Sequence, residues 1–138
     1  MGDVLGRDFI LEADDLVKEP VSVDEWKKGS IIYVKSLSAA EKGKINAKAV
    51  RASQKVGSAQ HRDFVENFDL DFVILCACDE KGTPLFTNGD RAALKQKNAA
   101  VISRIASAAQ RLSGFSKDDL DALEKNSETT QSEDSPLD

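Results

Sequence analysis

Apolar side chains recur at helical spacing through the middle of the chain. One run lies between residues 61 and 79, with apolar positions at Phe64, Phe68, Phe72 and Leu75. A second run lies between residues 90 and 113, with apolar positions at Leu94, Ile102, Ile105 and Leu112. This periodicity is typical of helices with one buried face. It predicts helices over 61–79 and 90–113 that pack antiparallel, joined by an acidic turn containing Gly82 and by the pair Leu85-Phe86.

Residues 20–35 have the alternation of a β-hairpin. Val21 and Val23 alternate with polar residues, residues 27–30 (Lys-Lys-Gly-Ser) form a turn signal, and the run Ile-Ile-Tyr-Val follows at 31–34. A lone hairpin is marginally stable in water. We therefore expect its apolar face, together with Trp26, to pack on the helical pair.

The residues before the hairpin are harder to interpret. Residues 1–17 mix acidic and apolar side chains, the large apolar ones being Phe9, Ile10, Leu11 and Leu16. We expect them to form one short strand or turn, held against the domain by these apolar anchors.

Further helices are predicted on both sides of the central pair. Ser38 and Glu41 have the spacing of a capping box, which predicts a helix over 39–54. Gly114 is expected to end the long helix in a left-handed conformation. A last short helix over 117–125 follows. The fold class is therefore α+β and predominantly helical, with an N-terminal hairpin packed on a small helical domain.

We expect one domain over residues 1–126. Its predicted core consists of Trp26, Phe64, Phe68, Phe72, Leu75, Phe86, Leu94, Ile102, Ile105 and Leu112. Residues 127–138 are polar and acidic with almost nothing to bury, and they are expected to form a disordered tail.

Charge is spread unevenly along the chain, whose net charge is −5. Residues 35–62 contain seven Lys or Arg against one acid, and residues 116–138 contain two Lys against eight acids. The basic segment 42–62 meets the electrostatic requirement for binding nucleic acid. It has no interleaved aromatic residues for base stacking, so a solvated helix face is the preferred interpretation.

No group of residues predicts catalysis, a cofactor or a metal. His61 lacks a nucleophile in a recognisable motif, and the pairs Asp69/Asp71 and Asp79/Glu80 do not lie in a calcium-loop pattern. Cys76 and Cys78 point in different directions on a helix, so free thiols in a reducing cytoplasm are expected. No apolar run is long enough to span a bilayer, and the N-terminus lacks the pattern of a secretory signal.

The order of the segments resembles the tail assembly chaperones of long-tailed, siphovirus-like bacteriophages and prophages. The likeness covers about residues 8–126. It rests on FILEADDL at 9–16, VDEW at 23–26, VKSLSAAEKGKI at 34–45, and above all the long stretch VILCACDEKGTPLFTNGDRAALKQKNAAVISRIASAAQRLSGFS at 73–116.

The resemblance implies a non-enzymatic protein of the bacterial host cytoplasm, absent from the mature virion. Such a protein binds the tape-measure protein, keeps it soluble and helps bring tail-tube subunits to it. The partners are then the tape-measure and tail-tube proteins, without nucleic acid or membrane, and self-association is left open. The alternative is a small nucleic-acid-associated regulator that uses residues 42–62.

A candidate partner surface lies near the end of the long helix. It consists of Leu112, Phe115, Leu120 and Leu123. The last three follow the break at Gly114, and Leu120 and Leu123 lie on a short helix with few neighbours to bury it. We expect this helix to be displaced at small cost, so that a client helix takes its place or lies beside it. The other interpretation is that Leu120 and Leu123 simply close the core.

Overall fold

The structure is a computed structural model that describes residues 2–115 and residue 118 of the 138-residue chain. In order, its elements are α1 (Arg7–Glu12), β1 (Lys18–Ser22), β2 (Ile31–Lys35), α2 (Ala39–Ser53), α3 (Ala59–Cys76), β3 (Ala77–Cys78), the 3-10 turn η1 (Asn88–Asp90), α4 (Arg91–Leu94) and α5 (Ala99–Leu112). The predicted class, α+β and mainly helical with an N-terminal hairpin, is confirmed. Apart from residue 118, the predicted helix at 117–125 and the tail at 127–138 lie outside the described residues.

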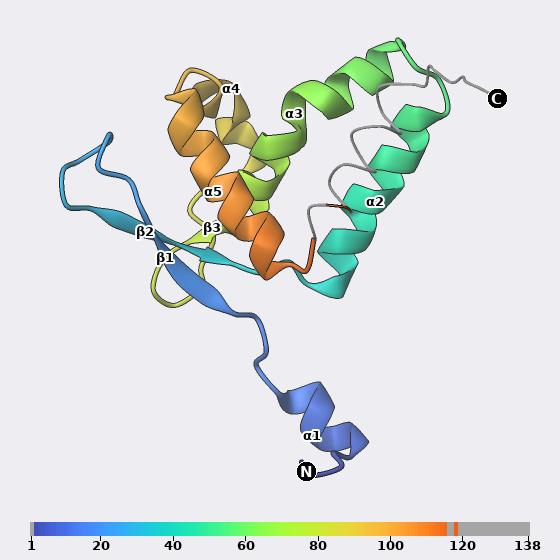
Figure 1. Ribbon diagram of the computed structural model, residues 1–138, viewed down its shortest axis with the longest axis vertical. Coiled ribbons are helices and arrows are strands. Elements are labelled where there is room, and N and C mark those ends of the chain that lie inside the picture. The colour runs from blue at the N-terminus through green and yellow to red at the C-terminus, as the bar shows by residue number, and fades with distance from the viewer. Residues whose placement is uncertain (1, 116–117, 119–138) are drawn as a thin grey trace.

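The hairpin forms two strands of a three-stranded antiparallel sheet with the order β1-β2-β3. Val21 pairs with Ile32, and Tyr33 of the central strand pairs with Cys78. One face of the sheet lies against α5, which also packs along α3, while α2 lies beside α3 (Figure 1). The helices therefore support the hairpin, which would be only marginally stable in water on its own.

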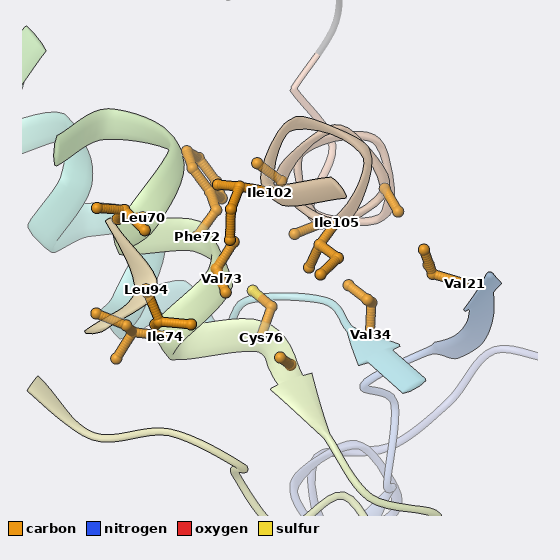
Figure 2. Packing of buried hydrophobic residues seen from close by; sticks show 14 of the residues in the cluster. Val21, Val34, Leu70, Phe72, Val73, Ile74, Cys76, Leu94, Ile102 and Ile105 are labelled. Atoms are coloured by element: carbon orange, nitrogen blue, oxygen red, sulfur yellow. The ribbon is translucent and has the colours of Figure 1, made fainter. Parts of the chain in front are cut away.

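The main core lies between the sheet and helices α3 and α5, and a smaller cluster of Ala49, Ala52 and Phe64 lies between α2 and α3. Figure 2 shows Val34 of β2 next to Ile105 of α5, with Phe72 and Val73 of α3 beside Ile102. Of the predicted core residues, five are buried: Phe64, Phe72, Leu94, Ile102 and Ile105. The other five are partly buried and pack against the core: Trp26, Phe68, Leu75, Phe86 and Leu112.

The first helix of the central pair ends earlier than predicted. It stops at Cys76, and Ala77 and Cys78 continue as β3, although the sequence predicted helix to residue 79. The backbone at Ala77 is extended (φ −67°, ψ 127°), and Ala77 is paired with Val34. The apolar run at 73–78 is compatible with either structure, and pairing with the hairpin decides for a strand at its end.

The second predicted helix, 90–113, is two helices with a break at 95–98. Asn98 begins α5 as an N-cap, because its Oδ1 accepts the Ala100 backbone N–H at 2.8 Å. Asparagine at this position competes with helix continuation by satisfying a free backbone donor. No large apolar residue between Leu94 and Val101 holds the intervening turn on the core.

The N-terminal residues do not dock on the domain. The prediction of a strand or turn held by apolar anchors is wrong, because residues 7–12 form α1 and every residue from 2 to 18 is exposed. In Figure 1, α1 lies apart from the other elements at the end of an extended connection. We call residues 2–17 the N-terminal arm and residues 18–115 the body.

Candidate partner-binding surfaces

The end of α5 has a defined turn that directs the chain back onto the core. Gly114 has φ +83°, its N–H donates to the Arg111 carbonyl at 3.2 Å, and the Phe115 N–H donates to the Gln110 carbonyl at 3.0 Å. This pair of bonds is a Schellman motif, which glycine favours because it has no Cβ. The predicted left-handed cap at Gly114 is confirmed.

Phe115 therefore enters the core instead of facing solvent. It is 7% exposed, and its ring meets the ring of Phe72 edge-on, with centroids 5.5 Å apart. Lys42 of α2 covers the ring from outside, its Nζ 4.6 Å from the centroid. Such contacts are typical of aromatic and cation–π packing.

Of the candidate surface predicted from sequence, the structure thus places Leu112, partly buried, and Phe115, buried. Leu120 and Leu123 lie outside the described residues. The accessible Phe115 expected from sequence is not found, because the Schellman turn aims it inward. The partner-binding role of the four residues stays a prediction.

A polar network that sequence reasoning missed joins α2, α3 and α4. Asp71 is buried, and its carboxylate accepts from Lys48 Nζ at 3.2 Å and forms an ion pair with Arg91 Nη2 at 2.9 Å. Arg91 also donates to Asn67 Oδ1 at 3.1 Å and to Asn88 Oδ1 at 2.9 Å. A buried carboxylate is tolerated only with such partners, so the network fixes the three helices relative to one another.

Asp69 and Asp71, weighed above as a cation-binding pair, have different surroundings. Asp69 lies near Ser103 of α5, whose Oγ donates to its Oδ2 at 3.4 Å, and burial raises the pKa of Asp69. Asp71 is neutralised by two cations from other helices. Within residues 2–115 and residue 118, no group of three or more candidate side chains could hold a metal ion.

The basic segment 42–62 covers most of α2, the turn after it and the start of α3, and part of its charge serves the fold. Lys48 pairs with Asp71, and Lys42 lies over Phe115. On the same face of the helix, between these two lysines, Ile45, Ala49 and Ala52 are buried. The capping box predicted from Ser38 and Glu41 is present, with the Glu41 N–H donating to Ser38 Oγ at 3.2 Å and the Ser38 N–H donating to Glu41 Oε1 at 2.9 Å.

The two cysteines are free and buried. Burial raises the pKa of the Cys76 thiol to about 12 and also raises the pKa of Cys78. A thiol kept protonated is a poor nucleophile and a poor metal ligand. Cys76 and Cys78 are thus packing residues at the junction of α3 and β3.

Seven of the twelve exposed large apolar residues in the described chain lie in the N-terminal arm. Its exposed apolar residues are Val4, Leu5, Phe9, Ile10, Leu11, Leu16 and Val17. The signal was present in the sequence as the run Phe-Ile-Leu, but sequence alone does not say whether such a run is buried. No helix in the described part of the chain is long and apolar enough to cross a membrane.

The sequence of this chain matches a known family. The family model for the phage tail assembly chaperone matches residues 7–131, which is most of the chain. This chain therefore belongs to the phage tail assembly chaperone family.

The fold is also similar to that of a solved structure from this class of protein. The tail assembly chaperone of bacteriophage HK97 superposes with a TM-score of 0.54 and 16% sequence identity, over 80% of this chain and 95% of that chain. At this identity the similarity is one of fold alone. No curated protein matches the chain in sequence.

Proposed function

We propose that this phage tail assembly chaperone binds the tape-measure protein, keeps it soluble and helps bring tail-tube subunits to it. It acts in the cytoplasm of the bacterial host, is absent from the mature virion and catalyses no reaction. The observation that carries the proposal is the family match over residues 7–131. The exposed apolar arm supports it, because a chaperone of amphipathic helices works through apolar surface.

The test is co-expression of the chaperone with the tape-measure protein of the same phage. We expect the tape-measure protein to be soluble with the chaperone and to aggregate without it. An aggregation-prone helical protein from an unrelated source is the control and should gain no solubility. Equal solubility of the tape-measure protein with and without the chaperone contradicts the proposal.

Recruitment of tube subunits has a separate test. Purified tail-tube protein should be retained by the complex of tape-measure protein and chaperone more strongly than by either component alone. Retention that is the same without the chaperone contradicts this part of the function and leaves tape-measure binding standing.

The proposal includes a second contact with the client, at the candidate surface formed by Leu112, Phe115, Leu120 and Leu123. A client helix would have to lie over Leu112 or replace Phe115 against Phe72, both within the core cluster. The double variant Leu120→Asp/Leu123→Asp, shown to be folded by circular dichroism, should lose part of its ability to keep the client soluble. If it protects the client as well as the parent does, this surface is not a contact.

A further inference from the structure

We propose that the N-terminal arm is the element that grips the client, and that it selects an apolar helix flanked by basic residues. The inference rests on the proposed function and adds to it the binding element and the chemistry of the bound segment. It is carried by the apolar surface of the arm, by its charge and by the lack of a matching surface on the body.

The apolar surface is concentrated at the helix of the arm. Phe9, Ile10 and Leu11 are consecutive and are 64%, 55% and 66% exposed. Three consecutive apolar residues left in solvent are unusual unless a partner covers them. A helix of six residues is also below the length that is stable alone in water. Docking on a partner would supply the contacts that this helix lacks.

Charge defines the partner. Residues 2–17 contain five acidic residues and one Arg. In α1, Asp8 and Glu12 flank the apolar run, and Asp14 and Asp15 follow it. Opposite charge around an apolar contact favours association, and like charge suppresses it. The matching segment is therefore apolar with Lys or Arg beside the contact.

The body does not offer such a surface, either to its own arm or to the arm of a second copy. Its exposed large apolar residues are Ile31, Val50, Val56, Val65 and Leu85. Ile31 is on β2, Leu85 is in the loop after β3, and only three valines lie around the turn between α2 and α3. Val50 and Val56 have basic neighbours in Arg51 and Lys55, but a valine side chain is smaller than the Phe, Ile and three Leu side chains that the arm exposes.

Two arms would not cover each other well, because both are acidic. Residues 119–138 would also be a poor partner for the arm, because they contain seven acids and one Lys. Among the surfaces of residues 18–115, none combines an exposed apolar run like that of the arm with positive charge. A separate protein segment is the occupant that satisfies both requirements.

The experiment compares full-length variants in binding to two designed amphipathic peptides. One peptide is built of leucine and lysine, and the other of leucine and glutamate in the same order. The arm variant is Phe9→Ser/Leu11→Ser. The matched body variant is Ile31→Ser/Val50→Ser, at positions that are also about half exposed. A third variant, Asp14→Lys/Asp15→Lys, reverses charge while keeping the apolar run.

We expect the parent to bind the leucine–lysine peptide more tightly than the leucine–glutamate peptide. The arm variant should lose at least about tenfold in affinity, as expected for removal of anchor residues from a contact. The body variant should bind like the parent, and the charge-reversed variant should lose its preference for the basic peptide. Unchanged melting temperatures show that the variants are folded.

Several results would overturn the inference. They are no binding of the leucine–lysine peptide by the parent, equal binding by the arm variant, or a preference for the acidic peptide. Sedimentation could give a further contradicting result. The parent would be an oligomer, and the arm variant would be a monomer that binds the peptide as the parent does. A second copy of the chain would then occupy the arm. Solubility of the tape-measure protein with the parent tests the proposed function separately, so the two failures are distinguishable.

Discussion

The arm and the body use the same kinds of apolar residue for opposite purposes. Phe72 of the body is 0% exposed and touches Phe68 and Phe115 edge-on, whereas Phe9 of the arm is 64% exposed. Burial is what makes an apolar side chain stabilising. The difference in burial separates residues that hold the fold together from residues that are free to bind a partner. Composition alone does not make this distinction.

The same contrast exists between charged residues. Asp71 has 8% of its side chain exposed and joins three helices through Lys48 and Arg91. Asp8 in the arm pairs with its neighbour Arg7, with both side chains at least 80% exposed. An exposed pair of this kind contributes little to stability, and loss of one partner of a buried pair costs much more. The arm is therefore built of groups that the fold does not need.

The largest expected effect is a difference in the free energy of unfolding between two phenylalanine variants, one in the body and one in the arm. Phe72→Ala should lower the free energy of unfolding by about 3–5 kcal/mol, because it leaves a cavity in the core. Phe9→Ala should change it by less than about 0.5 kcal/mol, because nothing covers that ring. Urea denaturation followed by circular dichroism measures both. A similar loss in the two variants would mean that the arm is packed on the body.

The second prediction concerns the matched pair of aspartates. Asp71→Asn should cost about 2–3 kcal/mol, below the full cost of breaking a buried pair because Lys48 is half exposed. Asp8→Asn should be nearly neutral. The measurement is again the urea midpoint. If Asp71→Asn leaves the midpoint unchanged, the network among α2, α3 and α4 is not a source of stability.

A smaller effect is expected at Asp69. Burial raises the pKa of this carboxyl, so the folded chain holds the proton more tightly than the unfolded chain does. Its ionised form therefore opposes folding at neutral pH, and this penalty is lost as pH falls through the raised pKa.

Asp69→Asn should thus stabilise the protein at pH 7 by less than about 1 kcal/mol, since the group is partly exposed. The gain should shrink as pH is lowered. Thermal melts of Asp69→Asn and of the exposed control Asp15→Asn at several pH values measure it. A gain that grows toward low pH would show that the raised pKa is wrong.

Local signals in the sequence predicted two helix caps and the helical core, although the Asn98 cap that begins α5 was missed. The Ser38–Glu41 capping box, the Gly114 cap and the turn at 79–84 each depend on neighbouring residues only. In that turn, Asp79 Oδ1 accepts the backbone N–H groups of Lys81 and Thr83 at 2.9 and 3.0 Å. Because their partners lie within a few positions, such features are visible without the fold.

Features that depend on distant residues were not predicted. The run at 73–78 changes from helix to strand because β2, some 40 residues away in the chain, pairs with it. Asp71 looked like surface charge because its partners Lys48 and Arg91 are each about 20 residues away. Phe115 looked accessible, but the turn at Gly114 places it against Phe72.

The arm is the clearest example of this limit. Phe9, Ile10 and Leu11 have the composition of core residues, and hydrophobicity predicted that they would dock. Whether an apolar run is buried depends on whether the rest of the fold leaves a surface for it. Here α3, α5 and the sheet cover one another, so the core is complete without the arm.

Hydrogen–deuterium exchange of the chaperone, alone and bound to the tape-measure protein, tests the central claim most directly. In the free protein, amides of residues 2–17 should exchange nearly as fast as in an unfolded chain, while those of α3 and α5 are protected. In the complex, the amides around Phe9–Leu11 should become protected, with little change in α3 and α5. Protection of the arm in the free monomer, or an arm that stays unprotected in the complex, would contradict the account.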